Sequence, residues 1–107
     1  MTDLSSWTGR DDGPGPEHAR WHNRIQAVDA AQPGVALLGF ASDEGVRRNH
    51  GRVGAVQGPA AIRAALGSFA VHHSTPLYDA GDIDVVENDL EAAQQRYGDA
   101  LAELLSH

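Results

Sequence analysis

The sequence predicts an α/β fold in which two parallel strands are joined through a helix. Two observations support this: an apolar run at Gly34–Ala41 is followed by a helix-periodic segment after Pro59, and a second strand-like run at Leu77–Val86 is followed by another periodic segment. The order strand, loop, helix, strand, helix implies a parallel pair with a crossover connection.

Residues 1–33 are expected to form an N-terminal extension with a short helix. Gly13–Pro16 alternates glycine and proline, which prevents regular structure there. Glu17–Val28 is predicted to be helical and to pack on the edge of the main body. Its apolar residues recur at helical spacing: Trp21, Ile25 and Val28. Trp7 is either an anchor onto the same body or exposed, and the sequence leaves both open.

Residues 34–107 are expected to form the N-terminal part of one α/β domain. Gly34–Ala41 is apolar on both faces, which is typical of a parallel strand covered on each side. Pro59 suits the first turn of a helix, where its missing N–H has no partner to lose. The predicted buried stripe of this helix is Ile62, Ala65, Leu66 and Phe69.

The second strand is predicted over Leu77–Val86 and the last helix after Asn88. Asn88 and Glu91 have the spacing of a capping box. The predicted buried face of the helix is Leu90, Ala93, Tyr97, Leu101, Leu104 and Leu105. Two strands leave an open sheet edge, whereas sheets usually hold about four to six strands. We therefore expect the sequence to be the first part of a larger α/β protein.

The composition excludes several classes of protein. Hydrophobic residues make up 41% of the chain, which predicts a packed core, and a net charge of −7 argues against non-specific binding to nucleic acid. There is no cysteine, hence no thiolate nucleophile and no cysteine metal site. The longest apolar run is far below the roughly 18 residues of a membrane span, and no signal-peptide pattern opens the chain. A cytoplasmic location is expected.

The segment Asp43–Pro59 is the part of the sequence best suited to binding. It follows a strand, and ligands of open α/β sheets bind beyond the carboxyl ends of strands. Its glycines allow close backbone approach, and its arginines offer planar donors to carboxylate or phosphate. These residues are Gly45, Gly51, Gly54, Gly58, Arg47, Arg48 and Arg52. The segment matches neither common nucleotide-binding motif. The arginines either bind an anion or pair with Asp43, Glu44 or the sheet edge.

Other candidate ligands are weaker. Asp79, Asp82 and Asp84 could attract a hard cation, yet no histidine lies nearby, and acids at a strand end that face water or cap a turn explain them better. His72 and His73 are adjacent, so their side chains point apart in an extended chain, and they are expected on a loop surface.

The residues resemble a known family. Gly34–Leu66 closely resembles the N-terminal strand, loop and helix of bacterial formimidoylglutamases, which belong to the arginase/agmatinase (ureohydrolase) superfamily. DEGVRRN followed by GR-x-GA-x-x-GP is specific to that branch. Weaker matches are Trp7–Asp12 with Arg20–His22, and Tyr78–Asp82.

The resemblance implies a three-layer α/β/α fold around a mainly parallel sheet. It also implies hydrolysis of N-formimidoyl-L-glutamate to L-glutamate and formamide, in histidine degradation, with two Mn²⁺ ions that activate hydroxide. The family's metal ligands lie in Gly-Gly-Gly-His, Asp-Ala-His-x-Asp and Asp-x-Asp segments. Neither the Gly-Gly-Gly-His nor the Asp-Ala-His-x-Asp segment occurs here, and the Asp-x-Asp at Asp82–Asp84 comes too early in the chain to be the family's later segment. The chain is therefore expected to be truncated before these segments and inactive alone.

By position, Arg47, Arg48, Asn49 and Arg52 are expected to bind the carboxylates of the substrate. The leading hypothesis is the N-terminal portion of a formimidoylglutamase, which forms homo-oligomers and has no nucleic-acid or membrane partner. The alternative is a stand-alone, non-catalytic anion-binding module that uses the arginine-rich loop.

Overall fold

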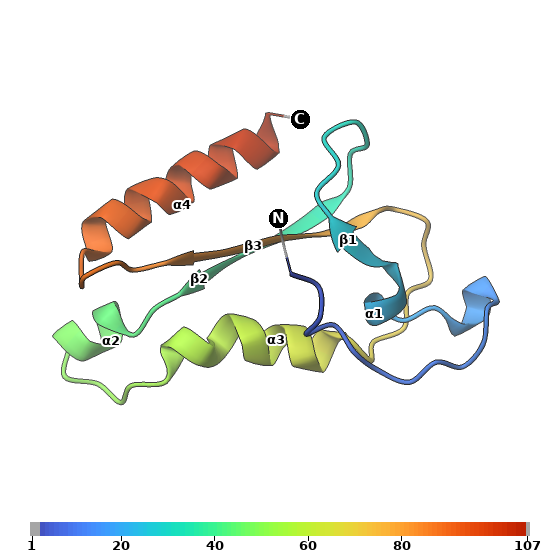
Figure 1. Cartoon of the computed structure of the whole chain (residues 1–107), viewed down its shortest axis with the longest axis horizontal. Coiled ribbons are helices and arrows are strands. Elements are labelled where there is room, and N and C mark those ends of the chain that lie inside the picture. The colour runs from blue at the N-terminus through green and yellow to red at the C-terminus, as the bar shows by residue number, and fades with distance from the viewer. Residues whose placement is uncertain (1–2, 107) are drawn as a thin grey trace.

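The computed structural model describes residues 3–106, and a three-stranded parallel sheet runs through its centre (Figure 1). The strands are β1 (Ile25–Ala27), β2 (Val35–Ala41) and β3 (Leu77–Asp84), in the order β1–β3–β2. Both β1 and β2 pair in parallel with β3. The predicted parallel pair is therefore confirmed, and the sheet has one strand more than expected.

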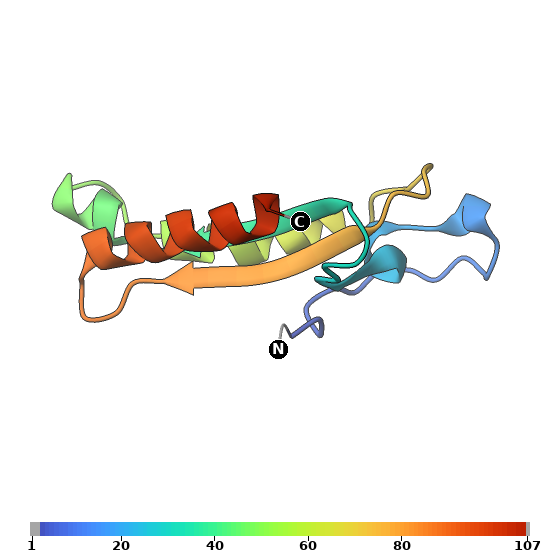
Figure 2. The ribbon, with the colours of Figure 1, turned by 90° about the horizontal axis from the view of Figure 1, so that it is seen from above.

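Helices cover both faces of this sheet. Figure 2 shows α4 (Leu90–Leu105) in front of the strands and α3 (Gly58–Leu66) behind them, which gives the predicted α/β/α layers. The shorter helical elements are η1 (Pro16–His18), α1 (Trp21–Arg24), α2 (Glu44–Arg48) and η2 (Ala55–Gln57). Within residues 3–106, none of these helices has the length and apolar character needed to cross a membrane.

The predicted helix over Glu17–Val28 is wrong. Its middle forms only the single turn α1, and the backbone turns extended at Ile25, with φ −65° and ψ 140°. Ile25 then begins β1, because Ile25–Ala27 pairs with Leu77–Asp79 of β3. Pairing with a distant strand outweighs the local helical periodicity. Val28, the last residue of the predicted stripe, is 40% exposed.

The apolar core lies where the N-terminal segment meets the sheet. Trp7, Ile25, Val71 and Leu77 are buried together, and Trp7 stacks on Trp21 with ring centroids 6.2 Å apart. Trp7 is thus an anchor, which settles the choice that the sequence left open. The predicted domain boundary at residue 33 stays a prediction, although residues on both sides of it share this core.

The two short N-terminal segments that carry the weaker resemblance contact each other. Arg20 donates from Nη2 to the Asp12 carboxylate at 2.9 Å, and the Arg20 Nη1 donates to the Ser68 carbonyl at 2.7 Å. The His22 ring nitrogen Nε2 lies 2.8 Å from the Arg10 carbonyl oxygen. These polar contacts fix the N-terminal segment beside the end of α3.

The predicted apolar stripe of α3 is mostly wrong. Ile62 and Phe69 are each 59% exposed, and Phe69 lies beyond the helix. Leu66 alone packs against the core, while the residue that the helix buries is Arg63. The helix turns this face to the sheet because Arg63 reaches the buried carboxylate of Asp79 and the more exposed carboxylate of Asp82 on β3, and these contacts replace apolar packing.

The capping of α4 also differs from the prediction. Its N-cap is Asp89, whose carboxylate accepts the Ala92 N–H at 3.0 Å, and Asn88 has a left-handed φ of 64° instead. Ala93 is buried, as predicted, and Tyr97 is half-buried with its ring edge-on to Phe40. The far end of the predicted buried face is wrong, because Leu101 and Leu105 are 40% and 76% exposed.

Candidate functional site

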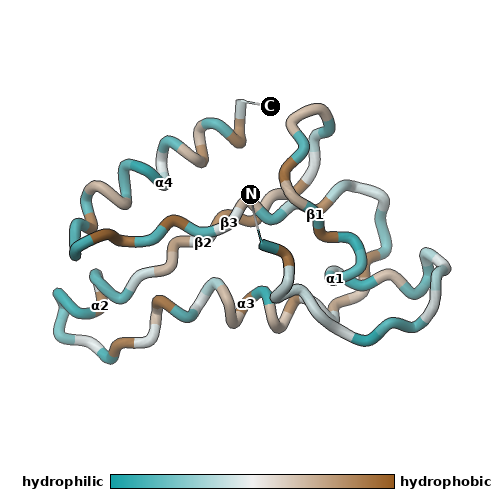
Figure 3. Tube along the Cα trace, in the orientation of Figure 1, coloured by the Kyte–Doolittle hydropathy of each residue, from teal (hydrophilic) through white to brown (hydrophobic). Residues whose placement is uncertain are grey.

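The carboxyl ends of β2 and β3 lie together at one end of the sheet, beside α2 (Figure 1). This is the edge where open α/β sheets bind ligands. A cavity of about 310 Å³ lies there, which we call the carboxyl-edge cavity. Its wall includes Asp43, Glu44, Arg47, Asp84 and Asn88. Hydrophilic residues gather on α2 at this end (Figure 3).

The segment after β2 contains more helical structure than the long, glycine-rich loop that the sequence predicts. The Ser42 hydroxyl accepts the Glu44 N–H at 2.9 Å, and α2 follows directly. Asp43 accepts the N–H groups of Gly54 and Val56 at 2.9 and 2.8 Å, which folds the rest of the segment back. Gly54 has a φ of 146°, a conformation that strongly favours glycine.

Glu44 is a buried carboxylate held by two arginines. It is 6% exposed, and its Oε1 accepts from the Arg47 Nε at 2.9 Å. Its Oε2 accepts from the Arg47 Nη2 at 2.5 Å and from the Arg48 Nε at 2.9 Å. The hydrogen bonds from Arg47, and then those from Arg48, lower the pKa of Glu44 and outweigh the effect of burial. The group is therefore ionised near neutral pH.

Arg48 continues from Glu44 to the start of α4. Its Nη1 donates to Glu91 at 2.6 Å, and its Nη2 donates to the Asn88 carbonyl at 3.1 Å. Glu91, followed by Glu44, raises the pKa of Arg48 above its ordinary value. Glu91, which the sequence placed in a capping box, thus pairs with α2 instead.

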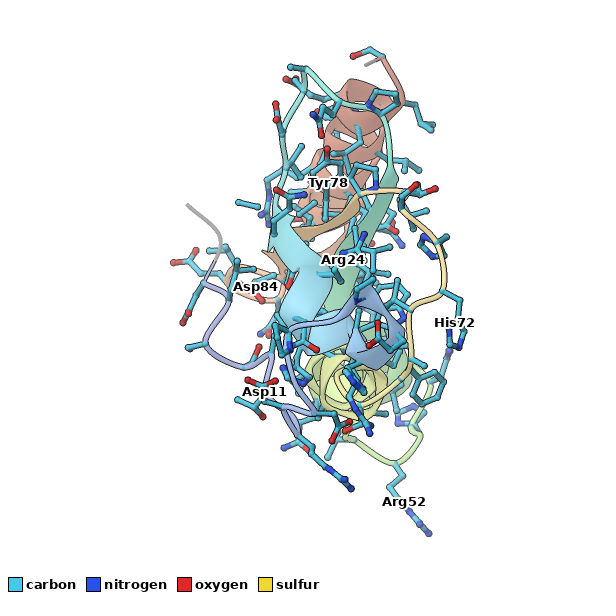
Figure 4. All side chains as sticks on the ribbon, turned by 90° about the vertical axis from the view of Figure 1, so that its right-hand side faces the viewer. Asp11, Arg24, Arg52, His72, Tyr78 and Asp84 are labelled. Carbon is cyan, nitrogen blue, oxygen red and sulfur yellow. The ribbon has the colours of Figure 1, made fainter. Side chains whose placement is uncertain are left out.

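The structure brings together only part of the predicted substrate-binding set. Arg47 lines the carboxyl-edge cavity, and Arg47 and Arg48 share Glu44, which is one of the pairings that the sequence allowed. Asn49 is exposed at the end of α2. Arg52 is exposed and projects outward, on a different side of the molecule from Asp84 (Figure 4). Substrate binding by these residues stays a prediction.

A second polar cluster is built around Arg63, which is 7% exposed. Its Nε and Nη2 donate to the two oxygens of Asp79 at 2.9 and 3.0 Å, and its Nη1 donates to Asp82 at 2.7 Å. Asp79 also accepts the Trp7 indole N–H at 2.7 Å. The interpretation of these acids as water-facing is therefore wrong for Asp79, which is 2% exposed.

The geometry of this cluster depends on a bulge in β3. The register changes between Leu37, opposite Asp79, and Gly39, opposite Asp82. The extra residue in β3 lets Asp79 and Asp82 both reach Arg63, although alternation would point residues three apart to opposite faces. Burial tends to raise the pKa of Asp79, but the hydrogen bonds from Arg63 and Trp7 outweigh it, so the pKa is lowered.

The described residues do not fit a metal centre. Within residues 3–106, no three histidine, aspartate or glutamate side chains come close enough together to hold a metal ion. Asp79 and Asp82 are engaged by Arg63, and His72 and His73 are exposed on a loop, as predicted.

Comparison with known proteins gives one consistent answer. The model of the arginase family matches residues 33–107. Formimidoylglutamase of Chromobacterium violaceum is 51% identical over 108 residues, which is 99% of this chain and 35% of that protein. The Aeromonas hydrophila formimidoylglutamase is 49% identical over 96% of this chain and 34% of its own length, and that of Rhodococcus jostii is 48% identical over 92% and 32%. The chain thus spans about a third of the length of these relatives.

Proposed function

The chain belongs to the arginase family, and on that premise we propose that it forms the N-terminal portion of a formimidoylglutamase. The observation that supports this most strongly is 51% identity to such an enzyme over 99% of the chain. The proposed reaction of the complete enzyme is hydrolysis of N-formimidoyl-L-glutamate to L-glutamate and formamide, as a step of histidine degradation in the cytoplasm.

The proposal assigns metal chemistry to a part of the enzyme other than the described residues. Two Mn²⁺ ions would supply the attacking hydroxide in the complete enzyme. Residues 3–106 contain no matching set of ligands, so no step through the metal is derived from them.

The contribution proposed for this chain is substrate binding at the carboxyl-edge cavity. The substrate carries two carboxylates, and arginine forks bind carboxylates with two parallel hydrogen bonds. Arg47, Arg48, Asn49 and Arg52 are the candidates, and Arg47 lines the cavity. A small-molecule substrate also agrees with the net charge of −7, which disfavours nucleic acid as a partner. Assembly as a homo-oligomer, without a membrane partner, is part of the same proposal.

A hybrid enzyme tests this function. Residues 1–107 replace the matching N-terminal third of the Chromobacterium violaceum formimidoylglutamase, and formamide release is measured with N-formimidoyl-L-glutamate and Mn²⁺. We expect metal-dependent turnover by the hybrid. The chain alone should show none, because its described residues hold no metal site.

The unmodified relative is the positive control, and circular dichroism checks that the hybrid is folded. A folded hybrid that releases no formamide would contradict the proposal. Metal-dependent turnover by the 107-residue chain alone would contradict the assignment of the metal chemistry to other residues.

A further inference from the structure

We propose that the arginines after β2 have different tasks: Arg47 determines specificity by receiving a substrate carboxylate, and Glu44 is the residue that positions it. Arg48 is then a structural bridge that does not touch the substrate. This inference rests on the proposed function, since it concerns the same cavity, and it reduces the four candidates to one contact residue.

Arg47 is oriented by one edge of its guanidinium and keeps the other edge available. Nε and Nη2 both donate to Glu44, in a side-on pair. Nη1 has no hydrogen-bond partner among the residues that the structure describes, 3–106. The side chain is 57% exposed and lines the carboxyl-edge cavity. A guanidinium has five N–H donors in a rigid fork, so a ligand carboxylate can still bind while Glu44 stays bound.

Arg48 has no such spare edge. Its Nε donates to Glu44, its Nη1 to Glu91, and its Nη2 to the Asn88 carbonyl and, at 3.4 Å, to Glu91. All three nitrogens are therefore engaged. A substrate carboxylate would have to displace Glu91, whereas at Arg47 it displaces nothing. Arg48 instead ties α2 to the start of α4, which fixes one wall of the cavity.

Glu44 can position Arg47 because it is itself fixed. Its backbone N–H binds Ser42, and its side chain is 5% exposed, so the carboxylate has little freedom. Glu44 is shared by Arg47 and Arg48, and Arg48 is also paired with Glu91, so these four side chains together are neutral. The attraction for an incoming carboxylate therefore comes from the open N–H donors of Arg47, not from a net positive charge. Without this anchor, the long side chain of Arg47 would lose its fixed orientation.

Two other carboxylates line the cavity and would oppose an anion. Asp43 already accepts two backbone N–H groups, which disperse its charge. Asp84 lies exposed at the end of β3, where water screens it. Their presence confines a bound carboxylate to the open edge of Arg47. Asn49 and Arg52 do not line the cavity.

The test uses the 107-residue chain with glutarate as the dicarboxylate probe and glutaramide as its uncharged control. Arginine side-chain N–H resonances are followed by NMR during each titration. We expect glutarate, and not glutaramide, to shift the Arg47 resonances. Arg47→Lys keeps the charge but loses the fork, and should weaken glutarate binding by about tenfold.

Arg48→Lys is the matched control, and should leave glutarate binding within about twofold while lowering the thermal midpoint, because a surface ion-pair bridge is lost. If Arg48→Lys does not fold, Glu91→Gln removes the same bridge and leaves Glu44 intact. Glu44→Gln should weaken glutarate binding and reduce the preference for glutarate over glutaramide. A loss of stability alone would not change this ratio of affinities.

Equal weakening by Arg47→Lys and Arg48→Lys would overturn the inference, and so would a titration in which glutarate shifts no Arg47 resonance. The hybrid enzyme separates this outcome from failure of the proposed function. If the hybrid is active but glutarate shifts no Arg47 resonance, only the present inference is refuted. Glutarate binding at Arg47 together with an inactive hybrid refutes only the enzyme assignment, and would favour a non-catalytic anion-binding module.

Discussion

Replacing Asp79 by asparagine tests whether the polar cluster around Arg63 holds the N-terminal segment to the sheet. Asp79 accepts four hydrogen bonds, from the Trp7 indole, from Nε and Nη2 of Arg63, and from the Gly81 N–H. An asparagine side chain has one acceptor oxygen, so its NH₂ group would face at least one of these donors. The variant also leaves the buried Arg63 guanidinium without its main counter-charge.

Breaking a buried ion pair costs about 3–5 kcal/mol. Arg63 keeps Asp82 and the Gly81 carbonyl, so we expect the lower end, about 3 kcal/mol. With a urea slope of about 1–2 kcal/mol per molar, the midpoint falls by about 1.5 M or more. A chain of this size has a total stability of roughly 5 kcal/mol at the low end, so about 2 kcal/mol would remain and the variant is expected to stay folded in water but to unfold at low urea concentration.

Urea unfolding followed by circular dichroism and tryptophan fluorescence measures this effect. Trp7 loses its acceptor, so its emission should also shift towards that of an exposed indole. Asp84→Asn at the exposed end of the same strand is the control, and should change stability by no more than about 0.5 kcal/mol. Indistinguishable midpoints for the two variants would refute the assignment of Asp79 as the central acceptor.

Two further predictions concern neighbouring features. The pKa of Glu44 is lower in the folded chain than its unfolded value of about 4.3, so its contribution to stability is present above that pH and is lost as the pH falls through the folded pKa. As the pH falls below about 4.3, the urea midpoint of Glu44→Gln should therefore decrease less than that of the unsubstituted chain. Equal decreases of the two midpoints would contradict this. Gly39→Ala places a Cβ against the Asp82 carboxylate and should cost about 1–3 kcal/mol. Gly45→Ala is the control, because its added Cβ meets nothing within 4 Å, and it should leave the thermal midpoint unchanged or raise it. Equal losses of stability in the two variants would contradict the predicted clash at Gly39.

The long elements of the fold could be predicted because their patterns are local. An apolar run at residues 34–41 and a strand at residues 77–86 agree with β2 and β3, and the helices between and after them are present. The strand β1 could not be found in this way. It has three residues, its apolar spacing also fits a helix, and its partner is far away in the sequence.

The buried face of α3 was missed for a different physical reason. Apolar periodicity assumes that charged side chains point to water, but Arg63 points to the sheet because Asp79 is buried beside it. The sequence identified the arginines of the candidate site as a group. It could not rank them, because the burial of Glu44 and the bridge from Arg48 to Glu91 depend on how α2 and α4 meet.

The central place of β3 has a consequence for folding during synthesis. Neither β1 nor β2 has a partner strand until β3 has left the ribosome, because both pair only with β3 in the described sheet. Trp7 precedes its acceptor Asp79 by 72 residues, an interval of roughly 4–14 s at 5–20 residues per second. Until that interval ends, Trp7, and then Trp21 and the apolar β2 as each is synthesised, lack the contacts that β3 supplies. Codons that slow elongation between β2 and β3 would lengthen this interval, and the N-terminal segment would then be the region most open to chaperones or to self-association.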